Sequence, residues 1–146
     1  MSATNAFETA VLNLYFLNTD HANVGDAAGL QNSVAAGSFY VSLHTADPGE
    51  AGAQNTTEAT YTGYARVAVA RSGAGWTVAA NNAANAAAIT FPAASAGSDI
   101  ITHFGVGSDL SGVGNLFFKG ALNASRTISA GITPSFAIGE LDVNAD

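Results

Sequence analysis

Short runs in which apolar and polar residues alternate dominate the chain from position 38 onward. In residues 39–44, Phe39, Val41 and Leu43 fall on one face and the intervening residues on the other. This period of two predicts a half-buried β-strand whose first face lies in the core.

A second alternating run covers residues 64–69, where Val67 and Val69 share one face. Arg66 falls on the opposite face, beside Tyr64. We therefore expect Arg66 to point to solvent or to a partner protein, because the two valines lie on the opposite face.

Glycine, asparagine and proline separate these runs at the spacing typical of an antiparallel sandwich or barrel. Leu110–Asn115 carries two glycines and predicts the turn of a hairpin. The predicted fold is mainly β, an antiparallel, jelly-roll-like β-sandwich with one N-terminal α-helix. The predicted strands are Phe39–His44, Tyr64–Ala70, Trp76–Ala79, Ala87–Phe91, Ile100–Gly107, Leu116–Ala121, Arg126–Ser129, Pro134–Ile138 and Glu140–Val143.

The pattern before position 18 is helical instead. Asn5 is placed to cap a helix, with Glu8 three residues later, the arrangement of a capping box. Apolar residues then recur at helical spacing, which predicts a helix that needs burial on several sides, against its own sheet or another subunit. The first face comprises Phe7, Val11, Leu14 and Tyr15, and it is widened by Leu12, Phe16 and Leu17.

Three stretches lack a regular pattern. Residues 18–37 are small and polar and predict a loop, and residues 79–88 predict a broad turn. Thr45–Gly63 is acidic and long for so small a chain, which is typical of an interaction arm or a disordered segment. We expect a single domain over residues 1–146, with a helix and arm over 1–37 and a sandwich over 38–146.

Composition limits the classes of partner. Of the 146 residues 48% are hydrophobic and only 10% are charged, which favours a neutral surface that packs against neighbours. The formal net charge is −7 and the four basic side chains are scattered, so nucleic acid is not expected as a partner. Cysteine is absent, which removes disulfides, thiolate metal sites and a cysteine nucleophile. We also expect no signal peptide and no membrane partner, because the start is not basic and no apolar run approaches about 20 residues.

The candidates for chemistry have simpler structural explanations. His21, His44 and His103 form no pair at helical spacing, and a serine elbow of the G-x-S-x-G type is absent. Two acidic groups could bind calcium, Asp20 with Asn23 and Asp26 and, separately, Asp47 with Glu50, but neither follows the calcium-loop pattern. We therefore predict no enzyme, with no catalytic, metal-ligating or cofactor-binding residue and no cofactor.

A series of motifs resembles a family of small tailed-phage structural proteins, often labelled phage tail fibre proteins. The motifs run in order from residue 39 to residue 143 and include L-x-T-x-x-P-G, G-Y-A-R, T-H-F-G and F-x-x-G-x-L. In this sequence they are Leu43–Gly49, Gly63–Arg66, Thr102–Gly105 and Phe136–Leu141. The resemblance implies a virion component with a β-sandwich-like body and no enzymatic residues.

Within such a particle we expect a capsid decoration (cement) protein that is assembled in the host cytoplasm. Its expected partners are the major capsid protein and neighbouring copies in a homotrimer, with contacts from the Phe7–Leu17 helix and the Thr45–Gly63 loop. The alternatives are a tail or tail-fibre protein, which the absence of a long repetitive shaft makes less favoured, and a carbohydrate- or receptor-binding module. Tyr61, Tyr64 and Trp76 are the candidate rings for glycan binding.

Overall fold

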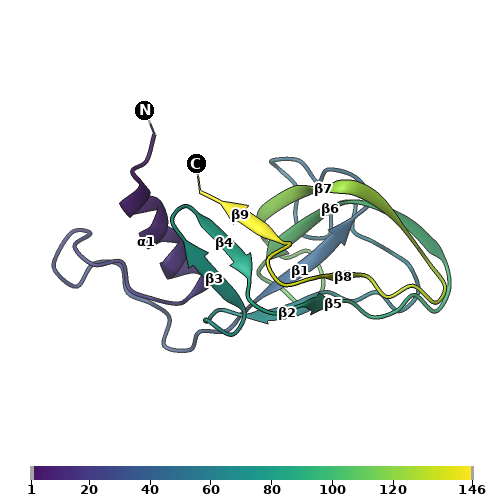
Figure 1. Cartoon of the computed structure of the whole chain (residues 1–146), viewed down its shortest axis with the longest axis horizontal. Coiled ribbons are helices and arrows are strands. Elements are labelled where there is room, and N and C mark those ends of the chain that lie inside the picture. Colours follow the sequence, from purple (N-terminus) through teal and green to yellow (C-terminus); the bar gives the residue numbers. More distant parts are fainter. Residues whose placement is uncertain (1, 146) are drawn as a thin grey trace. The chain divides into compact units, whose positions relative to one another are not determined.

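The computed structural model describes residues 2–145 as antiparallel sheets with one N-terminal helix (Figure 1). Its strands form a four-stranded sheet in the order β2-β1-β6-β7, a three-stranded sheet in the order β3-β4-β9, and the pair β5-β8. The predicted fold class, a mainly β sandwich with one N-terminal helix, is confirmed. The elements are α1 (Asn5–Phe16), β1 (Ser38–His44), β2 (Val67–Ala70), β3 (Trp76–Ala79), β4 (Asn82–Asn85), β5 (Ile89–Thr90), β6 (Ser98–Gly107), β7 (Leu116–Ser129), β8 (Ser135–Phe136) and β9 (Asp142–Asn144).

The chain forms two compact units, each built from separate stretches of sequence. Residues up to Ser38, Ala70–Ile89 and those from Phe136 onward make the first, called here the helix unit. Phe39–Val69 and Thr90–Ser135 make the second, called the sheet unit. The grouping does not follow the expected boundary between residues 37 and 38, and folding as one cooperative domain stays a prediction. No helix among residues 2–145 is long and apolar enough to cross a bilayer.

Helix α1 begins one residue earlier than the expected cap allows. Thr4 is the N-cap, in an extended conformation, and its hydroxyl accepts a hydrogen bond from the N–H of Phe7. The prediction that Asn5 caps the helix is therefore wrong, because Asn5 is already its first residue. Threonine and asparagine both accept this bond well, so the backbone conformation decides between them.

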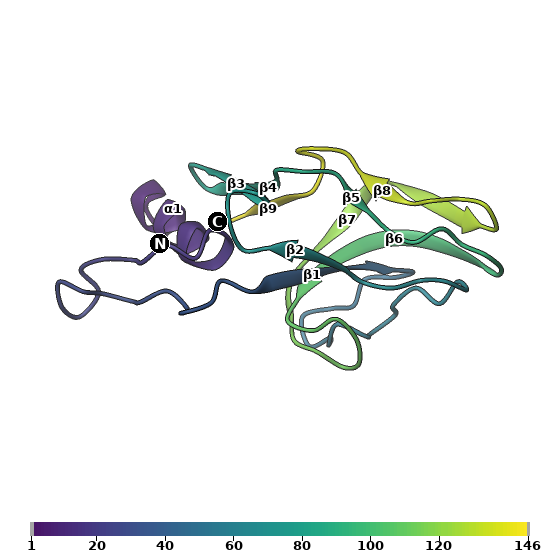
Figure 2. The same cartoon turned by 90° about the horizontal axis from the view of Figure 1, so that it is seen from below.

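The buried face of α1 also differs from the expected one. Leu12 and Phe16 are 2% and 0% exposed, and the Phe16 ring meets Trp76 edge-on with centroids 4.6 Å apart. Phe7 and Tyr15, expected on the buried face, are 53% and 43% exposed. Figures 1 and 2 show the helix beside β3 and β4, which cover only one side of it.

The stretch predicted as a broad turn contains a strand. Asn82–Asn85 pairs with β3 and also with β9, so β4 is the centre of the three-stranded sheet. The prediction for residues 79–88 is wrong because alanine and asparagine carry little β-propensity, and neighbouring strands on both sides supply the missing stabilisation. Asn85 is buried and binds the segment around Leu141 through both its backbone and its side chain.

The loop over residues 18–37 is confirmed, and a single side chain joins its end to α1. The guanidinium of Arg71 donates to the carbonyl oxygens of Leu14 and Tyr15 at 2.9 and 2.6 Å and to that of Ala36 at 3.0 Å. The last carbonyls of a helix lack partners within the helix, and a cation beside them also interacts favourably with the negative end of the helix dipole. Arg71 thus stabilises both the helix end and the exit of the loop.

In the sheet unit, both faces of β1 are buried. Phe39, Val41 and Leu43 lie in the core, as predicted, with 6%, 0% and 3% exposure. Ser42 and His44, on the other face, are 0% exposed. The segment Thr45–Gly63 covers them, bonding back to β1 through Ala59 N–H and Leu43 O. This long loop is therefore ordered by contacts within its own unit.

The predicted strands at Leu116–Ala121 and Arg126–Ser129 are one strand, β7. Its pairing with β6 shifts register between Ile101 and His103, where four residues of β7 lie opposite one residue of β6. A bulge of this kind bends an edge strand and interrupts its free edge, which makes pairing with another strand less favourable.

Candidate functional site

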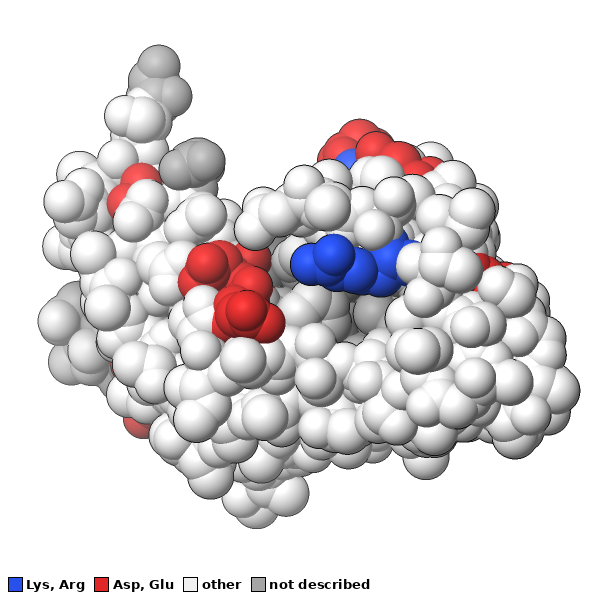
Figure 3. Space-filling view, turned by 45° about the vertical axis from the view of Figure 1, so that its right-hand side comes forward, with Lys and Arg blue, Asp and Glu red and all other residues white. Residues whose placement is uncertain are grey.

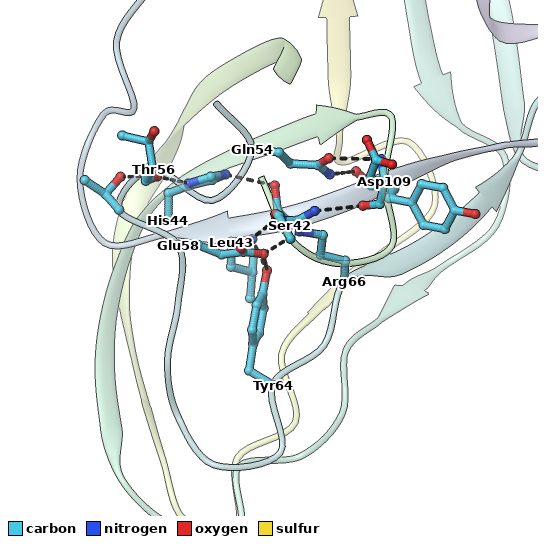
Figure 4. A network of polar contacts seen from close by, with 12 residues as sticks. Ser42, Leu43, His44, Gln54, Thr56, Glu58, Tyr64, Arg66 and Asp109 are labelled. Atoms are coloured by element: carbon cyan, nitrogen blue, oxygen red, sulfur yellow. Dashed lines mark hydrogen bonds and ion pairs between the residues drawn. The ribbon is translucent and has the colours of Figure 1, made fainter. Parts of the chain in front are cut away.

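A network of polar side chains lies between β1, the Thr45–Gly63 loop and the β6–β7 hairpin (Figure 4). At its centre Arg66, 5% exposed, binds Glu58 through two hydrogen bonds of 2.7 and 2.8 Å. These bonds raise the pKa of Arg66. The prediction that Arg66 points to solvent or to a partner protein is wrong. Glu58 lies beside Arg66 inside the same unit and removes the cost of an unpaired buried charge.

Arg66 also fixes the turn of the β6–β7 hairpin. Its guanidinium donates to the carbonyl oxygens of Asp109 at 2.8 Å and Gly112 at 2.6 Å. Gln54, fully buried, donates to the Tyr40 carbonyl at 2.8 Å and accepts from the Asp109 N–H at 3.2 Å. Buried polar groups thus hold a surface loop in one shape (Figure 4).

Tyr64 completes this network. Its hydroxyl donates to a Glu58 oxygen at 2.8 Å and accepts from the Leu43 N–H at 3.1 Å. Burial raises the pKa of Tyr64, so the hydroxyl stays protonated and serves as a fixed donor at neutral pH.

Ser42 and His44 form the arrangement most similar to a catalytic pair. The Ser42 hydroxyl lies 2.8 Å from His44 Nε2, and His44 Nδ1 lies 2.8 Å from the Thr56 carbonyl oxygen. Since a carbonyl only accepts, Nδ1 carries the proton and Nε2 accepts from the serine. Burial lowers the pKa of His44. Both side chains are 0% exposed, so a substrate cannot reach them in this conformation.

The other two histidines make their side-chain contacts with residues outside this pair. His103 is half-buried, lies opposite His44 in the sheet register, and places Nδ1 2.8 Å from the Thr102 hydroxyl. His21 is half-buried against the Phe7 ring, with centroids 5.7 Å apart. Neither has a neighbouring carboxylate in hydrogen-bond contact among residues 2–145.

The two acidic groups considered for calcium are used locally. Asp26 accepts from the N–H groups of Ala28 and Gly29, and Asp20 accepts from the N–H of Asn32. Within the described part of the chain, no three His, Asp or Glu side chains are grouped as metal ligands.

Asp47 and Glu50 instead share one cation. Lys119 Nζ lies 3.1 Å from Asp47 and 3.0 Å from Glu50. The hydrogen bond from the Gly49 N–H lowers the pKa of Asp47 most, and the hydrogen bond from Lys119 lowers it further. This exposed group joins the Thr45–Gly63 loop to β7.

The aromatic rings considered for glycan binding lie inside the units. Tyr61 and Trp76 are 3% and 1% exposed, and the Tyr64 ring packs between Tyr61 and Phe91. A sugar stacks on an open ring face, so these three rings are not a glycan platform. The alternation of residues 64–69 could not show this, because the covering segments come from elsewhere in the chain.

The exposed large apolar side chains lie at positions that sequence periodicity did not single out, apart from those on α1. The helix unit exposes Phe7, Tyr15, Val24, Leu30, Val34 and Ile138. The sheet unit exposes Ile100, Leu110, Val113, Phe117 and Ile132. Figure 3 shows a face on which charged side chains are few and most of the surface is neither acidic nor basic. Such a surface is suited to protein contacts more than to binding a polyanion.

A known protein family matches almost the whole of this chain. Residues 2–144 match the family described as podophage GP4 fiber I protein gp80. No curated protein matches the chain. The family is one of phage fibre structural proteins, which implies a component of the virion. Since the match extends over almost the whole sequence, the chain belongs to the podophage fibre I protein gp80 family.

Proposed function

We propose that this protein is a structural subunit of a phage fibre and acts through protein–protein contacts, without catalysis. The family match over residues 2–144 carries the proposal. The buried network supports it, because the side chains of the pairs Arg66–Glu58 and Ser42–His44 form their hydrogen bonds with each other and with the backbone. Those groups shape the protein and are closed to a ligand.

The contacts are proposed to come from exposed apolar side chains on a nearly neutral surface. On α1 these are Phe7 and Tyr15. The Thr45–Gly63 loop is a weaker candidate than its sequence suggests, because Gln54 and Ala59 are turned into its own unit. Neighbouring copies of the chain, in a homotrimer, are the proposed partners.

The alternative is capsid decoration, with copies bound to the major capsid protein where coat subunits meet. The family description names a fibre protein and so favours the fibre role over capsid decoration.

Gold labelling of phage particles tests the proposal. The chain has no cysteine, so Gly73→Cys creates one attachment point for maleimide-gold, at an exposed position with no neighbouring atom within 4 Å of a new Cβ. Wild-type particles control for cysteines of other virion proteins. We expect gold on the tail fibres in electron micrographs. Gold spread over the capsid surface would overturn the fibre role and support decoration.

A further inference from the structure

An apolar patch lies where α1 meets the segment of residues 18–37, both in the helix unit. The Phe7 ring contacts the His21 ring, with centroids 5.7 Å apart. His21 and Leu30 exchange two backbone hydrogen bonds of 3.0 and 2.9 Å as an antiparallel pair, and the side chains of such a pair share one face. Phe7 and Leu30 are 53% and 48% exposed. These three side chains, called here the apolar patch, therefore form one open surface.

The segment of residues 18–37 supports the patch through polar bonds. Asn18 and Ser33 are joined by two hydrogen bonds of 2.9 Å, and Asp20 accepts from the N–H of Asn32 at 2.7 Å. Figures 1 and 2 show the segment extending past α1 on the side away from β3 and β4. A backbone that is already ordered in this way loses little entropy when a partner covers the patch.

The patch belongs to an acidic part of the molecule. Asp20 and Asp26 are exposed on the same segment, and each leaves its second carboxylate oxygen without a partner among residues 2–145. The sequence contains no lysine or arginine before Arg66. The basic residue of the helix unit is Arg71, which donates to backbone carbonyls at the end of α1 and the end of the segment. The charge beside the patch is therefore negative.

This charge argues against three occupants of the patch. Nucleic acid and an anionic membrane would both be repelled by it. A second copy offers few cations, because Arg66 is buried against Glu58 and Lys119 is bound by two carboxylates. Arg71 is bound to carbonyl oxygens, which leaves Arg126 as the exposed cation of such a copy. The remaining complement is a positively charged surface on a different protein.

We propose that the apolar patch docks onto another virion protein, at a surface where lysine or arginine side chains surround an apolar recess. Phe7 and Leu30 enter the recess, and the carboxylates of Asp20 and Asp26 face the cations around it. This inference rests on the proposed fibre function, because it takes the partner to be another protein of the particle. It assigns Phe7 to that partner and leaves the contacts between copies to the other exposed side chains.

The two parts of the surface contribute differently to binding. Apolar side chains at the centre of an interface carry most of the binding energy, whereas charges around them govern the association rate and the choice of partner. Binding should therefore depend on Leu30 at any ionic strength. The contribution of the carboxylates should decrease as salt screens it.

Particles made by a phage that lacks the gene for this chain provide the probe, and the full-length protein is added to them. The fraction that sediments with the particles gives an apparent Kd. We expect Leu30→Ser to raise this Kd about tenfold, because the half-exposed leucine becomes covered in the complex. The control Leu110→Ser removes a leucine that is 57% exposed in the sheet unit and leaves the Kd unchanged.

Substitutions of opposite charge at one position separate electrostatic from steric effects. Ala27 is exposed beside Asp26. We expect Ala27→Lys to raise the apparent Kd about threefold and Ala27→Glu to lower it about threefold, with both changes smaller at high salt. The control Ala130→Lys, at an exposed position of the sheet unit, leaves the Kd unchanged.

Carbodiimide coupling in complete virions identifies the occupant, because it joins a carboxylate to a lysine amine in contact with it. We expect Asp20 or Asp26 to be linked to a lysine of a different virion protein. Lys119 is the one lysine of this chain. A link from either aspartate to Lys119 would show that this chain itself covers the patch, and would overturn the proposal.

Circular dichroism first shows that each variant is folded. Equal effects of Ala27→Lys and Ala27→Glu, unchanged binding of Leu30→Ser, or no binding of the wild type would each overturn the docking surface. The gold-labelling experiment is independent of these results. Gold on the capsid with opposite effects at position 27 refutes the fibre role alone, and gold on the fibres with equal effects there refutes the docking surface alone.

Discussion

Replacement of Arg66 by methionine is expected to destabilise the sheet unit strongly. The side chain is 5% exposed and makes four hydrogen bonds of 2.6 to 2.8 Å, two to Glu58 and one each to the carbonyls of Asp109 and Gly112. Methionine fills much of the volume and forms none of these bonds. Glu58 then remains largely buried without its cation.

The magnitude follows from what stays unpaired. Removing one partner of a buried ion pair costs about 3–5 kcal/mol, and a domain of this size is stable by only about 5–15 kcal/mol. The double variant Glu58→Gln with Arg66→Met also removes the uncompensated charge. It should regain part of the loss, but about 1 kcal/mol remains for each of the two hairpin carbonyls.

Urea unfolding followed by circular dichroism at pH 7 measures both variants. We expect a fall in the free energy of unfolding of about 3 kcal/mol or more for Arg66→Met, with faster hydrogen exchange in the 109–115 turn. A loss below about 1 kcal/mol for the single variant would show that Glu58 reaches water without Arg66, and the reasoning would fail.

Three further predictions concern local features. Burial lowers the pKa of His44 below 6.5 in the folded state, so as the pH falls the unfolded state takes up this proton at a higher pH than the folded state does. The free energy of unfolding should therefore decrease as the pH drops from about 7.5 to 5.5, and it should decrease less steeply in His44→Gln. Equal pH slopes for the two proteins in thermal melts would contradict this. Gly105→Ala should lower the free energy of unfolding in urea by about 2–4 kcal/mol, because a new Cβ would lie 2.6 to 2.7 Å from packed side chains. The control Gly73→Ala, whose Cβ has no atom within 4 Å, should change this free energy little. Thr4→Ala should lower the free energy of unfolding by about 1 kcal/mol, and Asn5→Ala should lower it by less than half of that. The reverse order would show that Asn5 is the cap.

The local pattern was sufficient where a segment's own residues decide its conformation. The strand β1 and its core residues Phe39, Val41 and Leu43 follow from a period of two. The helix follows from the recurrence of apolar residues at helical spacing. The 18–37 loop follows from its small polar composition.

The pattern failed where distant segments cover a residue. Seen locally, Arg66 lies on a polar face, but its partners are 8, 43 and 46 residues away in sequence. Residues Asn82–Asn85 have weak strand propensity and become a central strand because β3 and β9 pair with them from both sides. Such effects are absent from any single window of sequence.

The sequence by itself determined that this chain folds as antiparallel β-structure with one helix and carries no basic cluster or cysteine for polyanion or thiol chemistry. Only the tertiary structure decided which polar groups are buried together and which apolar side chains stay exposed. The physical reason is that alternation and helical spacing are properties of neighbouring residues, whereas burial and ion pairing depend on what other parts of the chain bring into contact. The shape of the hairpin turn at residues 108–115 is the clearest case, because it depends on the pair of Arg66 and Glu58, which lies far from it in sequence.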